Sequence, residues 1–160
     1  MKLYVMRHGP AEDFAPSGRD ADRALTPSGR DRVREVAKLL VKSDEAPRVI
    51  VSSPLVRALQ TAEIVAAEVG VDRVETSREL APGGDAYGFA RALASGDRKR
   101  PMIVGHEPDL SSLVSVFLGG FSLDMLKAMV VGLQARDGET HLRFVLDPKT
   151  LKLDREDVPG

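Results

Sequence analysis

Residues 3–9 read LYVMRHG, a run of four large apolar residues followed by a basic pair and a glycine. The apolar part, Leu3 to Met6, predicts a buried strand, because it is rich in strand-forming residues and too short for a helix. Residues 49–51 and 102–104 show the same pattern. Strands that are apolar throughout are typical of a parallel sheet covered by helices on both faces.

Amphipathic segments alternate with these strands. Thr26 followed by Pro27 predicts an N-cap and a first helical residue, which open a helix with one apolar face. Ser53 followed by Pro54 repeats the pattern and predicts the start of a second helix, which Gly70 ends. Two further helices are expected over about residues 85–93 and 108–119.

The last third of the chain has a different pattern. Residues 128–134 and 141–146 predict two strands of a β-hairpin around the turn Asp137-Gly138. The expected fold class is therefore α/β: a three-layer αβα sandwich whose central sheet is mostly parallel, with the antiparallel C-terminal hairpin at its edge. A length of 160 residues predicts a single domain over residues 1–160.

The composition excludes several classes of protein. The chain has no cysteine, which rules out disulfides, thiolate metal sites and a cysteine nucleophile. Lysine and arginine number 23 and aspartate and glutamate 24, so a net charge of −1 recruits neither nucleic acid nor an anionic membrane. No window is long and apolar enough for a membrane span or a signal peptide, and we expect a cytoplasmic location. Nothing in the pattern indicates the oligomeric state.

Basic side chains follow the predicted strands where a ligand would bind. Arg7 and His8 come after the first strand, Arg57 lies in the first turn of the helix after the second, and His106 follows a later strand. In open α/β sheets, ligands bind beyond the carboxyl ends of the strands. Two arginines and two histidines at one sheet edge predict a phosphate site, because the guanidinium fork matches two phosphate oxygens.

The histidines suggest how such a site would react. Neighbouring arginines lower the pKa of a histidine, which favours the neutral, nucleophilic form of His8 near pH 7. His106, in its charged form, would donate to a phosphate oxygen in the transition state. A metal site on His8 and His106 competes weakly, because the arginines repel a cation and no H-E-x-x-H spacing occurs, so we expect no metal and no cofactor.

Each residue alone also has a simpler interpretation. An Arg-His-Gly tripeptide is often only a turn, Arg57 alone would be a solvated helix residue, and His106 alone a surface histidine. The loop over residues 12–23 carries charges of both signs and would either contact a partner or, more simply, be a solvated loop. His141, the third histidine, is expected to be an exposed strand residue.

Four motifs occur in a fixed order along the chain: Met6-Arg7-His8-Gly9, Leu25-Thr26-Pro27-Ser28-Gly29, Ser52-Ser53-Pro54 with Arg57 and Thr61, and Gly105-His106-Glu107-Pro108. Together they resemble the histidine phosphatase superfamily, which has the phosphoglycerate-mutase-like fold. The resemblance implies that His8 attacks phosphorus and becomes phosphorylated, while Arg7, Arg57 and His106 bind the three equatorial oxygens. It also implies a general acid, for which Glu79 is the candidate.

Within that superfamily the chain looks most like the compact SixA-type phosphohistidine phosphatases. It is short, it carries ELAPGGD at residues 79–85, and the stretch before the strand at Met102 leaves no room for an inserted lid. The implied partner is a phosphate-bearing substrate, such as phosphohistidine on a protein. Glu79, Asp85 or neither would be the acid, and Glu79 would otherwise pair with an arginine. The alternatives are a phosphatase of small phosphomonoesters and a phosphate-binding module without catalysis.

Overall fold

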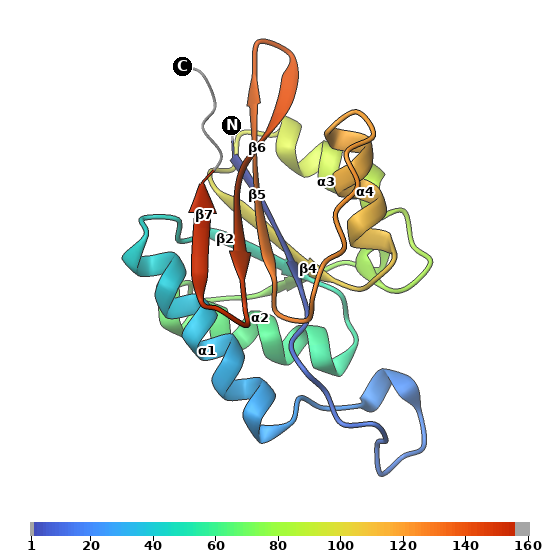
Figure 1. Cartoon of the computed structure of the whole chain (residues 1–160). Helices are drawn as coiled ribbons and strands as arrows, with labels where there is room; N and C mark the ends of the chain where they lie inside the picture. The colour runs from blue at the N-terminus through green and yellow to red at the C-terminus, as the bar shows by residue number, and fades with distance from the viewer. Residues whose placement is uncertain (1, 156–160) are drawn as a thin grey trace.

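One sheet of seven strands forms the centre of the molecule, in the order β3-β2-β4-β1-β5-β6-β7. This computed structural model describes residues 2–155 (Figure 1). The strands are β1 (Lys2–Arg7), β2 (Val49–Ser52), β3 (Glu75–Thr76), β4 (Pro101–Gly105), β5 (Val130–Arg136), β6 (Glu139–Asp147) and β7 (Lys152–Arg155).

Parallel pairing brings the ends of three strands to one edge of the sheet. β1 pairs with β4, and β4 with β2, in parallel, with Arg7 opposite Gly105 and Ser52 opposite Val104. The predicted mostly parallel half and the antiparallel hairpin of β5 and β6 are both confirmed. Two strands were not predicted: the very short β3, and β7, which pairs outside the hairpin and forms the edge of the sheet.

Helices cover both faces of the sheet, as expected for the three-layer sandwich (Figure 1). On β1, Tyr4 and Met6 pack into the core under α1 (Pro27–Lys42) and α2 (Val56–Val69). Leu3 and Val5 point the other way, into the core under α3 (Ala86–Ser95) and α4 (Asp109–Phe117), because successive strand residues alternate between faces. No helix within residues 2–155 has the length and apolar character needed to cross a membrane.

The two Ser/Thr-Pro pairs behave differently. Thr26 caps α1 as predicted, since its hydroxyl accepts a hydrogen bond from the Gly29 N–H at 2.8 Å. The prediction for Ser53 is wrong: α2 begins at Val56, with Leu55 in the N-cap position. The Ser53 hydroxyl accepts a hydrogen bond from the Leu55 N–H at 3.2 Å and lies 2.8 Å from His106 Nε2, so it contacts both the turn before α2 and the site.

A buried carboxylate joins the far end of α1 to the antiparallel half of the sheet. Glu45 is fully buried, and its Oε2 accepts a hydrogen bond from the Tyr4 hydroxyl at 2.8 Å. Its Oε1 accepts from Arg143 Nε at 2.8 Å and from Arg155 Nη1 at 2.9 Å. These bonds tie β1, β6 and β7 to the turn that follows α1.

Candidate functional site

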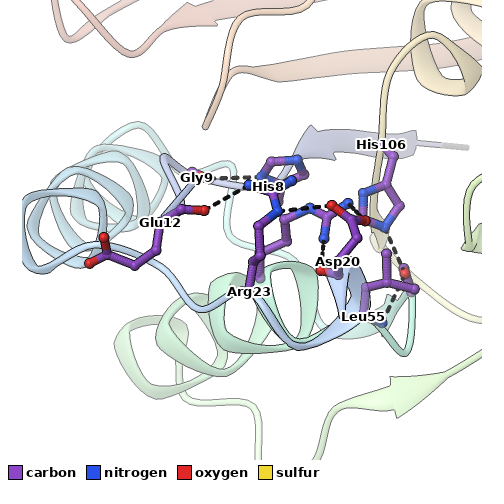
Figure 2. Close-up of polar contacts among 9 residues, drawn as sticks. His8, Gly9, Glu12, Asp20, Arg23, Leu55 and His106 are labelled. Atoms are coloured by element: carbon purple, nitrogen blue, oxygen red, sulfur yellow. Dashed lines mark hydrogen bonds and ion pairs between the residues drawn. The ribbon is translucent and has the colours of Figure 1, made fainter. Parts of the chain in front are cut away.

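The predicted basic residues meet at the carboxyl ends of β1, β2 and β4. Arg7 ends β1 and His8 follows it, while His106 follows β4 and Arg57 lies in the first turn of α2. The imidazole rings of His8 and His106 lie 5.3 Å apart between centroids. Figure 2 shows both rings beside Asp20 and Arg23 of the loop between β1 and α1. Residues far apart in sequence thus form one cluster.

The orientation of His8 defines which ring nitrogen can react. Its Nδ1 lies 2.7 Å from the backbone oxygen of Gly9, and a carbonyl can only accept a hydrogen bond, so Nδ1 carries the proton (Figure 2). In the neutral ring, Nε2 then holds a free lone pair. The backbone therefore fixes the tautomer that a nucleophile needs.

Burial keeps His8 neutral. The side chain is 7% exposed, and burial lowers the pKa of His8 to about 3, helped by the charges of His106, Arg57 and Arg7 and opposed by the bond to Gly9. The direction of the predicted shift is confirmed, but burial contributes more than the arginines do. A neutral imidazole at pH 7 is the reactive form.

We expect the His8 and His106 imidazoles to stay neutral from about pH 8 to about pH 5, a range in which free histidine gains its proton. The reason is the sign of both shifts: the pKa of each group is lowered, to about 3 for His8 and to about 4 for His106. An NMR titration of the ring protons checks this. A midpoint near pH 6.5 for either ring would contradict it.

Gly9 and Thr61 hold the backbone beside His8. The Gly9 N–H donates to the Thr61 hydroxyl at 3.0 Å, and that hydroxyl donates to the Arg57 backbone oxygen at 2.8 Å. A Cβ atom on Gly9 would lie 2.5 Å from the Val33 side chain, so only glycine fits against α1. Thr61 therefore links the segment after β1 that carries His8 to the first turn of α2, which carries Arg57.

Asp20 is the residue that sequence reasoning missed. The Arg57 guanidinium donates to the Asp20 backbone oxygen at 3.0 Å and to its carboxylate at 3.1 Å. Arg23 holds the other carboxylate oxygen at 2.8 Å, and this bond, with the nearby Arg57, lowers the pKa of Asp20 (Figure 2). Most of this loop is exposed, as the simpler expectation had it, but Asp20 also contacts a site residue 37 positions away in the sequence.

Asp20→Asn is expected to lower the inhibition constant of inorganic phosphate about threefold, because the anionic carboxylate competes with phosphate for Arg57. The change keeps the size of the side chain and removes only its charge. Asp22→Asn is the matched control, since Asp22 lies in the same turn but pairs with Arg19 and Ser17. Equal phosphate inhibition of wild type and Asp20→Asn would contradict the competition.

The environment of His106 favours the neutral ring in the protein without phosphate. This residue is 3% exposed, and burial together with the Arg57 charge lowers the pKa of His106 to about 4. The charged form expected in the transition state stays a prediction. Its Nε2 lies 2.8 Å from the Ser53 hydroxyl, which fixes the ring, and when that hydroxyl donates to Nε2 the neutral ring carries its proton on Nδ1.

Three buried polar side-chain atoms within residues 2–155 have no hydrogen-bond partner: Arg7 Nε, Arg57 Nε and His106 Nδ1. Buried donors are almost always paired in folded proteins, and exceptions usually mark function. All three belong to the residues that the sequence assigned to phosphate oxygens. The same part of the chain holds no cluster of three or more His, Cys, Asp or Glu side chains suited to a metal ion.

The two acid candidates, Glu79 and Asp85, lie between β3 and α3, in a segment that passes Gly105 at the end of β4. Glu79 is exposed, and its carboxylate accepts a hydrogen bond from the Asp85 N–H at 2.9 Å. Asp85 caps α3 by accepting from the Gly88 N–H at 2.9 Å. The polar contacts of Glu79 thus join it to the turn before α3, and within residues 2–155 it forms no ion pair with an arginine, which was the alternative to an acid role. His141 is a half-exposed residue of β6, close to its expected placement.

Comparison with known proteins identifies the family of this site. Residues 3–83 match the model of the histidine phosphatase superfamily (branch 1), a range that includes Arg7, His8 and Arg57. The chain belongs to the histidine phosphatase superfamily. It is a phosphatase and acts on phosphate-bearing substrates. The range that carries His106 lies outside the matched residues.

Two relatives align with most of this histidine phosphatase. It is 37% identical to an uncharacterised protein of Picosynechococcus sp. over 142 residues, which covers 84% of this chain and 86% of the relative. It is 30% identical to the phosphohistidine phosphatase SixA of Escherichia coli over 160 residues, which covers 96% of this chain and 98% of SixA.

A solved structure shows the same fold. The protein histidine phosphatase SixA complexed with tungstate superposes with a TM-score of 0.86 at 26% identity, covering 95% of this chain and 100% of that structure. The predicted phosphoglycerate-mutase-like fold and the resemblance to SixA are therefore confirmed.

Proposed function

We propose that this phosphatase hydrolyses phosphohistidine on a protein partner through a covalent phosphohistidine on its own His8. The observation that carries the proposal is the hydrogen bond from His8 Nδ1 to the Gly9 oxygen, which leaves the Nε2 lone pair free in a neutral, buried ring. The likeness to SixA, a phosphohistidine phosphatase, supports the choice of substrate.

The first step transfers the phosphoryl group. His8 Nε2 attacks phosphorus in line, the new N–P bond forms, and the bond to the imidazole of the substrate breaks. Arg7, Arg57 and His106 bind the three equatorial oxygens and stabilise their negative charge. As the phosphoryl group enters, Arg57 exchanges its contact with Asp20 for contact with the oxygens. The anion also favours a protonated His106, so this ring can donate in the transition state.

The second step uses water to hydrolyse the phosphohistidine, which returns free His8 and releases inorganic phosphate. The scheme is ping-pong, and every group it uses is a side chain of this chain, so we propose that it proceeds without a metal ion. The imidazole of a phosphohistidine is a good leaving group, because its other ring nitrogen takes a proton from water and the ring departs neutral. The departing histidine therefore needs little help from a general acid.

The direct test compares two substrates side by side in excess EDTA: a phosphohistidine-bearing carrier protein and p-nitrophenyl phosphate. We expect a higher kcat/KM for the phosphohistidine protein than for the ester, unchanged by EDTA. A preference for the ester would assign the enzyme to small phosphomonoesters. Phosphate binding without turnover of either substrate would favour a binding module.

Glu79→Gln is expected to leave phosphohistidine hydrolysis within about twofold of wild type and to slow ester hydrolysis about 100-fold, because only the ester needs the enzyme to protonate its leaving group. Glutamine retains an oxygen that can accept from the Asp85 N–H. Asp85→Asn is the control, since asparagine also caps a helix. Initial rates on both substrates check this, and an equal loss on both would make Glu79 necessary for phosphohistidine too.

A further inference from the structure

A basic hollow lies beside the phosphate site, and Arg7 is part of its lining. It measures about 350 Å³, and Arg7, Arg32, Lys127 and Lys149 supply its charges. Its apolar lining includes Pro10 and Leu126. Arg7 reaches this position because its guanidinium donates to the Met125 backbone oxygen at 3.0 Å. One arginine therefore borders both the phosphate site and the hollow.

The positive charge of the hollow is only partly balanced by the protein, because the Glu107 carboxylate lies near enough to Arg7 to act on its charge. None of the ion pairs within residues 2–155 includes any of its four basic residues. Arg32 donates to the Pro148 backbone oxygen, which positions it without neutralising it. Lys127 and Lys149 are exposed. In a chain with a net charge of −1, four such residues around one hollow form a local positive field that attracts anions.

We propose that this hollow binds an acidic side chain that flanks the phosphohistidine of the protein substrate, an inference that rests on the proposed function. Neighbouring Cα atoms in a peptide are about 3.8 Å apart, so a side chain one or two residues away follows the phosphoryl group into the site. Because Arg7 borders both places, the carboxylate lies next to the phosphoryl group. Lys127 and Lys149, which are exposed, attract this carboxylate from the solvent side of the hollow.

The composition of the hollow fits a carboxylate on a short aliphatic stem. Apolar walls accept the methylene groups, and lysine ammonium groups attract a charge without demanding a fixed geometry. The two lysines lie on different elements: Lys127 follows α4 in the segment before β5, and Lys149 lies in the turn between β6 and β7. The hollow therefore selects the flanking charge of a substrate, not one particular sequence.

The test uses two phosphohistidine peptides that differ only by glutamate or glutamine next to the phosphorylated residue, with p-nitrophenyl phosphate as a substrate without a flank. We expect wild type to show a KM about tenfold lower for the glutamate peptide, with a similar kcat. The double variant Lys127→Gln/Lys149→Gln is expected to lose this preference and keep its rates on the other two substrates. Added salt should weaken the preference in wild type only.

The control is Lys42→Gln. This variant replaces an exposed lysine in the last turn of α1, about 15 Å along the helix from Arg32. It is expected to keep the preference. Equal KM values for the two peptides in wild type would overturn the docking proposal and leave the proposed function standing. If wild type hydrolyses the ester but neither peptide, the docking proposal and the proposed function are both overturned. In a further outcome, the enzyme ignores the peptide flank and binds a small bisphosphate more tightly than a monophosphate. That result would assign the hollow to small molecules and would also overturn the docking proposal.

Discussion

His8→Ala is expected to slow phosphohistidine hydrolysis at least about 10⁴-fold, because removing a covalent nucleophile leaves only the binding groups to assist water. The remaining cluster still holds Arg7, Arg57 and His106, so phosphate affinity should change far less than kcat. Single-turnover rates with a phosphohistidine protein measure the first effect. Competitive inhibition of residual turnover, or calorimetric titration, by inorganic phosphate measures the second.

The covalent intermediate gives an independent readout of the same prediction. Wild type mixed briefly with a radiolabelled phosphohistidine protein and quenched in alkali should carry label on His8, and His8→Ala should carry none. His141→Ala is the matched control, because it removes a histidine of β6 outside the cluster, and we expect it to be labelled and active. Label on His8→Ala, or activity within about 100-fold of wild type, would place the nucleophile elsewhere.

Glu45→Ala is expected to lower the free energy of unfolding by about 3–5 kcal/mol, since breaking a buried ion pair leaves its partners without compensation. The Tyr4 hydroxyl and the Arg143 guanidinium would both lose their bond to this carboxylate. Urea denaturation measures the change. The control is Glu75→Ala, which removes a partly exposed pair with Arg98 and should cost less than about 1 kcal/mol.

The same carboxylate makes stability depend on pH. Burial, the largest influence, raises the pKa of Glu45, but the bonds from Arg143, Arg155 and Tyr4 outweigh it, so the pKa lies below its ordinary value. A lowered carboxyl pKa in the folded state contributes stability at neutral pH that is lost as the pH falls through that pKa. Glu45→Gln should therefore flatten the acid side of the stability curve. An unchanged acid side would contradict this role.

The sequence predicts most elements of the fold because their signals are local. Apolar runs mark β1, β2 and β4, and the threonine cap marks α1. The turn between β5 and β6 is also read locally, since Asp137 and Gly138 adopt positive φ values of 52° and 80°, as a tight hairpin turn requires. Two strands lack such a local signal: β3 is only two residues long, and β7 has a single apolar residue, Leu153, among three charged ones.

The site residues also fall into two groups, those that the local sequence predicts and those that depend on distant partners. Arg7, His8, Arg57 and His106 could be found because each follows a recognisable strand, and strand ends converge in this architecture. Asp20 and Glu45 could not, because each depends on partners far away in sequence. No local pattern distinguishes the aspartate that contacts Arg57 from its neighbour Asp22, which pairs within its own turn. Ser53 was assigned to a helix cap because its distant partner His106 cannot be read from the chain.

The order of strands has a consequence for how catalytic competence arises. β4 is made after β1 and β2 along the chain, yet it lies between them in the sheet and carries His106 at its end. β1 and β2, the strands that precede His8 and Arg57, therefore acquire their shared neighbour only when a long-range contact closes, which is a slow class of folding event. Recovery of enzyme activity after denaturation thus reports completion of the whole parallel half, a stage that helix content alone does not detect.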